Sequence, residues 1–144
     1  HHGGFFRFAA TFPDVQLRRG ARFVEAGNLA SAGGVSSGTD LALHVVARYL
    51  GRDAAVELAD GIEYQGKGWL DPDSNTSYAT LPPPDERHPR CPLCQMEADR
   101  SLSTTHKGVT YWFCAASEKQ FFDAHLEVID RFLAEDAART RAGR

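Results

Sequence analysis

The chain has 144 residues, of which 42% are hydrophobic and 24% are charged, and its formal net charge at pH 7 is −3. These values are typical of a globular protein, and the length suits one full domain or two small ones. The charge forms no basic cluster and no apolar run reaches the length of a membrane span, so we expect neither nucleic acid nor membrane as a partner.

The chain begins with His1 and His2, and its only methionine is Met96. This start predicts a fragment of a longer protein, unless the two histidines are the end of a purification tag. The next residues, from Phe5 onward, have apolar side chains at helical spacing, and Pro13 is expected to end this short helix.

Residues 15–34 are predicted to be extended. Two short apolar runs, ARFVEAG and NLASAGG, are separated by Gly27 and Asn28, a dipeptide typical of turns.

Two helices are expected to follow this extended segment. Ser37 is the predicted N-cap of the first helix, with Asp40 three residues later in the position of a capping box. Gly51 ends this helix, and residues 52–62 form a second one with an apolar face rich in alanine.

The composition changes after these helices. Residues 63–90 are rich in Gly, Pro, Asp, Ser and Asn, and three consecutive prolines at 82–84 favour a stiff polyproline II segment. We therefore predict a linker over residues 65–87, between a unit that covers residues 1–64 and another that covers residues 88–135.

The second unit is predicted to combine a strand with a helix. The sequence KGVTYWFC, at 107–114, alternates as a strand does and is rich in aromatic residues. The sequence from Ser117 to Asp136 predicts one amphipathic helix, and residues 136–144 are expected to be a frayed tail. The apolar face of that helix comprises Phe122, Leu126, Ile129 and Phe132 or Leu133.

Three motifs in residues 1–64, FPDV, GNLASAGGV and SGTDLALHVV, follow one another in a characteristic order. Together they resemble the C-terminal part of the ThiJ/PfpI family, whose fold is glutamine-amidotransferase-like. The resemblance implies an α/β fold class, here the C-terminal half of a flavodoxin-like or amidotransferase-like sandwich. The matching positions are Pro13, Asp14, Gly27, Asn28, Ser31, Gly33, Gly34, Gly38, Asp40, Leu43 and His44.

The segment SAGGVSSG is predicted to be a turn from a strand to a helix. Small residues there let a ligand approach the backbone, and a helix N-terminus offers free N–H groups. The residues that we expect beside such a ligand are Gly33, Gly34, Ser36, Ser37 and Asp40. The same glycines also suit tight packing of strand against helix, Asp40 suits a cap better than a catalyst, and His44 suits a core histidine better than a base.

In the ThiJ/PfpI family a reactive cysteine lies on a turn ahead of this region, whereas no cysteine precedes Cys91 here. The resemblance implies that, with a missing N-terminal half, the protein would carry out cysteine-dependent hydrolysis or hydration of a small molecule. Isonitrile hydratases are relatives of this kind, and His1 or His2 would then lie near the active pocket. Residues 1–144 alone are expected to be inactive, and the family implies a homodimer. Other relatives carry a DNA-binding domain, so a regulator lacking that domain is a further alternative.

All three cysteines, Cys91, Cys94 and Cys114, lie in the second unit. An odd number that includes a C-x-x-C pair favours metal ligation in a reducing, cytoplasmic setting, and no signal peptide is visible. Three thiolates supply three corners of a tetrahedron and favour Zn²⁺ or Cu⁺. A redox pair is an alternative, and no nucleotide or organic cofactor is expected.

The motifs CPLCQM and GVTYWFC, followed by a helix that begins with two phenylalanines, resemble a YHS domain, a small α+β module regarded as metal-binding. The positions that match are Cys94, Met96, Gly108, Tyr111, Phe113, Cys114, Phe121 and Phe122. The aromatic residues, together with Trp112, are predicted to form the small core.

The chain departs from the YHS pattern at two positions. Glu118 stands where the pattern has a second cysteine, and Cys91 stands where it has an aspartate. The fourth metal ligand could then be His106, Glu118 or His88, and His106 is preferred because it precedes the strand that carries Cys114. A degenerate YHS module without metal is the remaining alternative.

Overall fold

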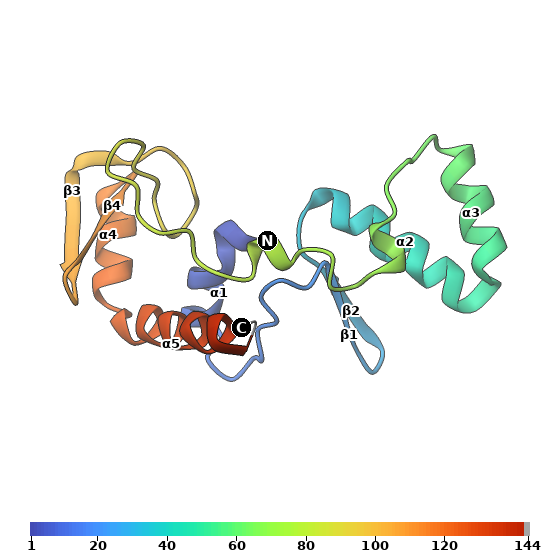
Figure 1. Ribbon diagram of the computed structural model, residues 1–144, viewed down its shortest axis with the longest axis horizontal. Coiled ribbons are helices and arrows are strands. Elements are labelled where there is room, and N and C mark those ends of the chain that lie inside the picture. The colour runs from blue at the N-terminus through green and yellow to red at the C-terminus, as the bar shows by residue number, and fades with distance from the viewer. Residues whose placement is uncertain (143–144) are drawn as a thin grey trace. The chain divides into compact units, whose positions relative to one another are not determined.

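The computed structural model describes residues 1–142, and contacts between residues divide the chain into two compact units (Figure 1). Unit 1 consists of residues 1–2 and 18–79, and unit 2 consists of residues 3–17 and those from Thr80 onward. The α/β class is confirmed at a coarse level, because the described residues form five α-helices and two separate two-stranded antiparallel sheets. No helix among them combines the length and the apolar character needed to cross a membrane.

Unit 1 begins with a β-hairpin. Strand β1 (Phe23–Ala26) pairs with β2 (Leu29–Ala32), and the two-residue connection is the predicted turn at Gly27 and Asn28. Gly27 has a φ of 64°, a left-handed conformation that glycine adopts without steric cost.

Helix α2 (Val35–Leu50) follows the hairpin directly, and α3 (Arg52–Gly61) follows after Gly51. The prediction that Ser37 caps α2 is wrong, because the helix begins two residues earlier, at Val35, with Gly34 as its N-cap. The side chains of Ser37 and Asp40 are only 2% and 0% exposed, so they serve the interior of the unit instead of its helix end.

Residues 65–79, which the sequence suggested as part of a linker, pack within unit 1. They contain two short 3-10 helices, η2 (Gly68–Leu70) and η3 (Thr76–Tyr78). Trp69 is buried against α2 and α3, where it completes an apolar core. The other buried members of this core are Leu43, Ala55 and Ala59.

Helix α1 (Phe5–Thr11), which follows η1 (His2–Gly4), is part of unit 2 although the sequence motifs grouped it with the first unit. The predicted helix is confirmed, and its buried residue Phe6 explains its place. The ring of Phe6 stacks on Phe122 at 5.1 Å between centroids and meets the edge of Phe132 at 6.4 Å.

The sheet of unit 2 is a second hairpin, formed by β3 (Asp99–His106) and β4 (Val109–Phe113). The predicted strand corresponds to β4, whereas β3 was not predicted. The turn between them consists of Lys107 and Gly108, whose φ values of 50° and 80° are both positive.

The amphipathic segment after β4 forms two helices, α4 (Ala116–Asp123) and α5 (Leu126–Ala142), so the prediction of one continuous helix is wrong. The break lies at Ala124 and His125, where the His125 ring nitrogen Nδ1 takes Phe121 O as a hydrogen-bond partner at 2.7 Å. The predicted apolar face is nevertheless present, because Phe122 and Ile129 are fully buried. Helix α5 continues to Ala142, through most of the predicted frayed tail, and positions 143 and 144 lie outside the described residues.

Candidate metal centre

The three cysteines of unit 2 lie together. The Sγ atoms of Cys91, Cys94 and Cys114 are all within 4.8 Å of one another, and those of Cys94 and Cys114 are 3.5 Å apart. All three are free thiols. Sulfur atoms bound to one tetrahedral zinc ion at about 2.3 Å are separated by about 3.8 Å. The cluster therefore has nearly the spacing that a shared metal ion requires.

A tight local turn places the first two thiols side by side. Arg90 and Glu97 form an isolated β-bridge around the CPLCQM segment. Inside it, Cys91 N donates to Met96 O at 2.9 Å and Gln95 N donates to Cys91 O at 2.8 Å. Gln95 takes a positive φ of 65°, which reverses the chain directly after Cys94. Backbone geometry therefore holds both thiols, without the need for any ligand.

The third thiol reaches the same place from the hairpin. Cys114 directly follows the last residue of β4, and Phe113 before it is fully buried in the core of unit 2. The sheet thus fixes the position of Cys114 relative to the 91–96 turn.

The cluster is electrostatically unusual because it brings together three ionisable thiols, of which Cys91 is buried and Cys94 and Cys114 are partly buried. Burial raises the pKa of Cys91, and burial together with hydrogen bonding to Cys94 raises the pKa of Cys114 to about 12. Without a cation, Cys91 and Cys114 are therefore neutral at pH 7 and make poor nucleophiles. A bound metal ion inverts this preference, because its charge stabilises the thiolates.

His106, the preferred fourth ligand from sequence, lies elsewhere. Its Nε2 atom is 2.8 Å from Asp130 Oδ1, and Lys107 Nζ is 2.7 Å from the same oxygen. His88 is exposed and lies 3.5 Å from Asp85. Neither histidine belongs to the group of close ligand atoms that the described residues form around the cysteines.

Glu118 is also outside that group, but it lines the same hollow as Cys94. It lies in the first turn of α4, four residues after Cys114, and its Oε1 atom accepts a hydrogen bond from Arg7 at 2.7 Å. Its Oε2 atom is buried and has no hydrogen-bond partner among residues 1–142. A buried carboxylate oxygen without a partner is costly unless it meets a donor, a proton or a cation.

Glu118 and Cys94 both line a hollow of about 460 Å³ beside α1. Its apolar wall includes Phe8 and Phe12, which are 41% and 50% exposed and whose rings lie 5.1 Å apart. Arg7 lies at the hollow as well, with its guanidinium group 4.2 Å from the centre of the Phe121 ring. The remaining lining residues are Gly3, Gly4, Thr11 and Leu93.

The turn that the sequence suggested as a ligand site in unit 1 connects β2 to α2, as predicted. Arg22 lies against it, donating from Nε to Asp40 and from Nη2 to Ser36 Oγ at 3.3 Å. Tyr64 donates a further hydrogen bond to Asp40 Oδ2 at 3.1 Å. Asp40 is therefore a buried carboxyl group that Arg22 and Tyr64 hold by hydrogen bonds, and it does not cap α2.

Asn75 completes the same network. Its Oδ1 atom accepts from Arg22 Nη1 at 2.9 Å, and its Nδ2 atom lies 3.5 Å from Ser37 Oγ and 3.3 Å from the position of a Cβ added to Gly33. The space in front of Gly33 and Ser37 is thus taken by the chain's own side chain. Sequence reasoning missed Arg22 and Asn75, since neither belongs to a motif near the turn.

The histidines of unit 1 have ordinary structural contacts. His2 stacks on the Tyr78 ring at 4.5 Å, and its neighbour His1 meets it edge-on at 5.4 Å. His44, expected in the core, is only partly buried, and its Nε2 atom lies 3.1 Å from Glu25. Hydrogen bonds from His44 and Arg48 lower the pKa of the Glu25 carboxyl group.

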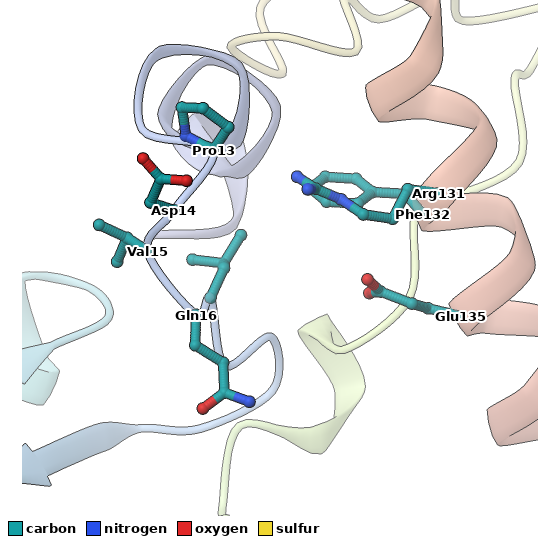
Figure 2. Close-up of a pocket in the computed structure, with 8 residues that line it drawn as sticks. Pro13, Asp14, Val15, Gln16, Arg131, Phe132 and Glu135 are labelled. Atoms are coloured by element: carbon teal, nitrogen blue, oxygen red, sulfur yellow. The ribbon is translucent and has the colours of Figure 1, made fainter.

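A second hollow of unit 2, of about 320 Å³, lies between α5 and the segment after α1. Figure 2 shows Arg131, Phe132 and Glu135 of α5 facing the segment that runs from Pro13 to Gln16. The FPDV motif of the ThiJ/PfpI resemblance therefore lines a hollow in the unit that carries the cysteines.

Comparisons with known proteins give no match of this chain to a protein family, a curated protein or a solved structure.

Proposed function

We propose that unit 2 is a metal-binding module that holds one Zn²⁺ ion through Cys91, Cys94 and Cys114. The observation that carries the proposal is the mutual approach of the three thiols within 4.8 Å. Cysteine sulfur is a preferred zinc ligand, and structural zinc sites are tetrahedral with four ligands. The YHS resemblance supports the same reading.

Glu118 is the proposed fourth ligand, and to bind the metal its carboxylate has to move closer to the thiols than it lies in this structure. Its Oε2 atom is buried without a partner among residues 1–142, on the same hollow as Cys94, while Arg7 binds the other oxygen. A carboxylate with one oxygen on the metal and the other on an arginine is both oriented and neutralised. This ligand set favours Zn²⁺ over Cu⁺, because Cu⁺ selects soft donors and a carboxylate is hard.

A redox role for the thiols is less well supported. Disulfide exchange proceeds through a thiolate, and at neutral pH the raised pKa values of Cys91 and Cys114 leave both protonated. The Sγ atoms of Cys94 and Cys114, 3.5 Å apart, are instead already close enough to share a metal ion.

The proposal is tested by titrating the reduced, metal-free protein with Co²⁺, a spectroscopic substitute for zinc, and then with Zn²⁺. We expect one ion per chain, sulfur-to-cobalt charge-transfer absorption, and loss of that absorption when Zn²⁺ displaces Co²⁺. Changing Cys91, Cys94 or Cys114 to serine should weaken binding strongly. The matched control is His106→Ala, which should bind as the wild type does because His106 is paired with Asp130.

Three outcomes would overturn the zinc site: no stoichiometric metal, binding that survives all three serine variants, or preferential binding of Cu⁺ with no effect of a change at Glu118. A protein that forms a Cys94–Cys114 disulfide and does not bind zinc would instead favour the redox alternative.

The hydrolase or hydratase activity implied by the ThiJ/PfpI resemblance stays a prediction, as do a small-molecule substrate, a homodimer and a regulatory role. That activity requires a nucleophilic cysteine ahead of residue 1, because the cysteines of residues 1–144 all belong to the cluster.

A further inference from the structure

We propose that the zinc ion of unit 2 exchanges Glu118 for an external thiol, whose apolar group then lies in the hollow beside α1. The inference rests on the proposed zinc site and names its ligand class, a small thiol with an uncharged aromatic or alkyl substituent. It would make the module a thiol-binding centre instead of a purely structural one.

The ligand set makes the fourth position the exchangeable one. Cys91 and Cys94 belong to one rigid turn, and Cys114 is fixed by β4. Glu118, by contrast, is a side chain partly open to solvent that already has a second partner, Arg7. Three thiolates make the metal site soft, so a fourth thiolate suits it better than a carboxylate oxygen does.

The hollow gives an external ligand access to this position. Cys94 and Glu118 are among its lining residues, and Phe8, Phe12 and Leu93 supply apolar surface. Its volume of about 460 Å³ falls in the range of small-molecule sites. The partial exposure of Phe8 and Phe12 leaves apolar area that a ligand can cover.

Charge limits which thiols fit. Zinc with three cysteine thiolates carries a formal charge of 2 − 3 = −1, and a fourth thiolate brings it to about −2. A thiol that bears a carboxylate would add further negative charge beside Glu118. We therefore expect uncharged thiols such as phenylmethanethiol to bind better than acidic ones such as 3-mercaptopropionate.

The exchange balances without an oxidant. The thiol sulfur forms a bond to zinc, the bond between zinc and Glu118 Oε2 breaks, and the thiol proton passes to water. Glu118 then remains as a carboxylate paired with Arg7 through Oε1.

The test uses the Co²⁺-loaded full chain, kept reduced with a phosphine so that no other thiol is present. Titration with phenylmethanethiol should raise the sulfur-to-cobalt absorption to a plateau as a fourth thiolate joins. Glu118→Cys should show the four-thiolate spectrum without added thiol and should not respond to it. Glu118→Gln, a second variant that keeps the side-chain shape, should respond at least as readily as the wild type.

The apolar wall is tested by Phe8→Ala and Phe12→Ala, which alter exposed rings. We expect each substitution to weaken the binding of phenylmethanethiol by about tenfold, because it removes apolar surface that the ligand's ring would cover. Binding of 2-mercaptoethanol, which has no ring, should hardly change.

The outcomes separate the two proposals. If Co²⁺ binds with a three-thiolate spectrum that added thiol leaves unchanged, the exchange is wrong and the zinc site stands. If thiol strips the metal and the absorption disappears, the exchange is also wrong. If Co²⁺ does not bind at all, the proposed function itself fails.

Discussion

Asp130 on α5 is the residue that ties the tip of the second hairpin to the rest of unit 2. One of its oxygens, Oδ1, lies within 2.8 Å of His106 and of Lys107. Hydrogen bonds from Lys107 and then from His106 lower the pKa of the Asp130 carboxyl group. Folding therefore favours the charged form of Asp130, and this charged form in turn stabilises the folded state.

The pH dependence follows from the sign of this shift. Because the pKa is lower in the folded state, the stabilisation is complete above the ordinary carboxyl value of about 3.9 and disappears as the pH falls through the folded value. Asp130→Asn should lower the urea midpoint at pH 7, and the difference from the wild type should shrink below about pH 4. A difference that stays constant from pH 7 to pH 2.5 would contradict this account.

Arg7 is expected to act on the metal through Glu118. Its removal leaves the Glu118 carboxylate without its only described hydrogen-bond donor, so the side chain loses its orientation. Loss of such an outer partner typically costs about 10- to 100-fold in metal affinity. Arg7→Ala should show this loss in a Zn²⁺ competition assay with a chromogenic chelator, and Arg52→Ala, an exposed change in unit 1, should not.

At the scale of residues, the sequence predicted that the three cysteines belong together, and they do lie close to one another. His106, which the sequence favoured as the fourth ligand, lies outside their group. His106 pairs with Val109 at the tip of the hairpin, whereas Cys114 follows the other end of β4. Val109 and Cys114 are five positions apart along the extended chain, a distance of about 16 Å. His106 was favoured because it is near Cys114 in the sequence, but the length of the strand separates the two residues. Glu118, in the first turn of α4, lines the same hollow as Cys94.

Among the elements, the β3–β4 hairpin depends on its two-residue turn. Lys107 and Gly108 both have positive φ values, as in the type I′ turns that match the twist of paired strands. Gly108→Ala should destabilise unit 2 by about 1–2 kcal/mol through backbone conformation alone, since a Cβ there meets no atom within 4 Å.

Gly38→Ala is the matched control. Gly38 also has open space around it but lies within α2. Alanine there should stabilise unit 1 by about 1 kcal/mol. Thermal denaturation of both variants checks the pair, and equal effects of the same sign would show that backbone conformation is not the cause.

Hydrophobic periodicity explains which elements could be predicted. It indicated α1, α3, β4 and the apolar face of α4 and α5, all of which bury apolar residues. It could not indicate β3, whose sequence DRSLSTTH has a single apolar residue, Leu102. The sequence also could not indicate the helix break at Ala124 and His125, because neither residue is a proline or a glycine.

For the molecule as a whole, composition predicted two units, but the residues that belong to each unit differ from those predicted. Residues 3–17 belong with the cysteines because Phe6 fills the aromatic core of unit 2. Residues 65–79 belong to unit 1 because Trp69 fills its core and Arg22 N donates to Pro72 O at 2.6 Å. Contacts between distant segments decide such limits, and local composition carries no information about them.

Each unit contains one of the chain's two tryptophans, Trp69 in unit 1 and Trp112 in unit 2, which makes the consequence of metal binding measurable. A ligand that binds only the folded state stabilises it by about 2.7 kcal/mol at 100 times its Kd. All three thiols lie in unit 2, so zinc should stabilise that unit by such an amount.

Trp69→Phe leaves Trp112 as the fluorescent reporter, and Trp112→Phe leaves Trp69. Zinc should raise the urea midpoint that Trp112 reports and leave the midpoint that Trp69 reports unchanged. Adding Cys94→Ser to the Trp69→Phe variant should abolish the shift. Equal shifts at both tryptophans would mean that the units unfold as one, because metal binding in one unit can stabilise the other only through a shared transition.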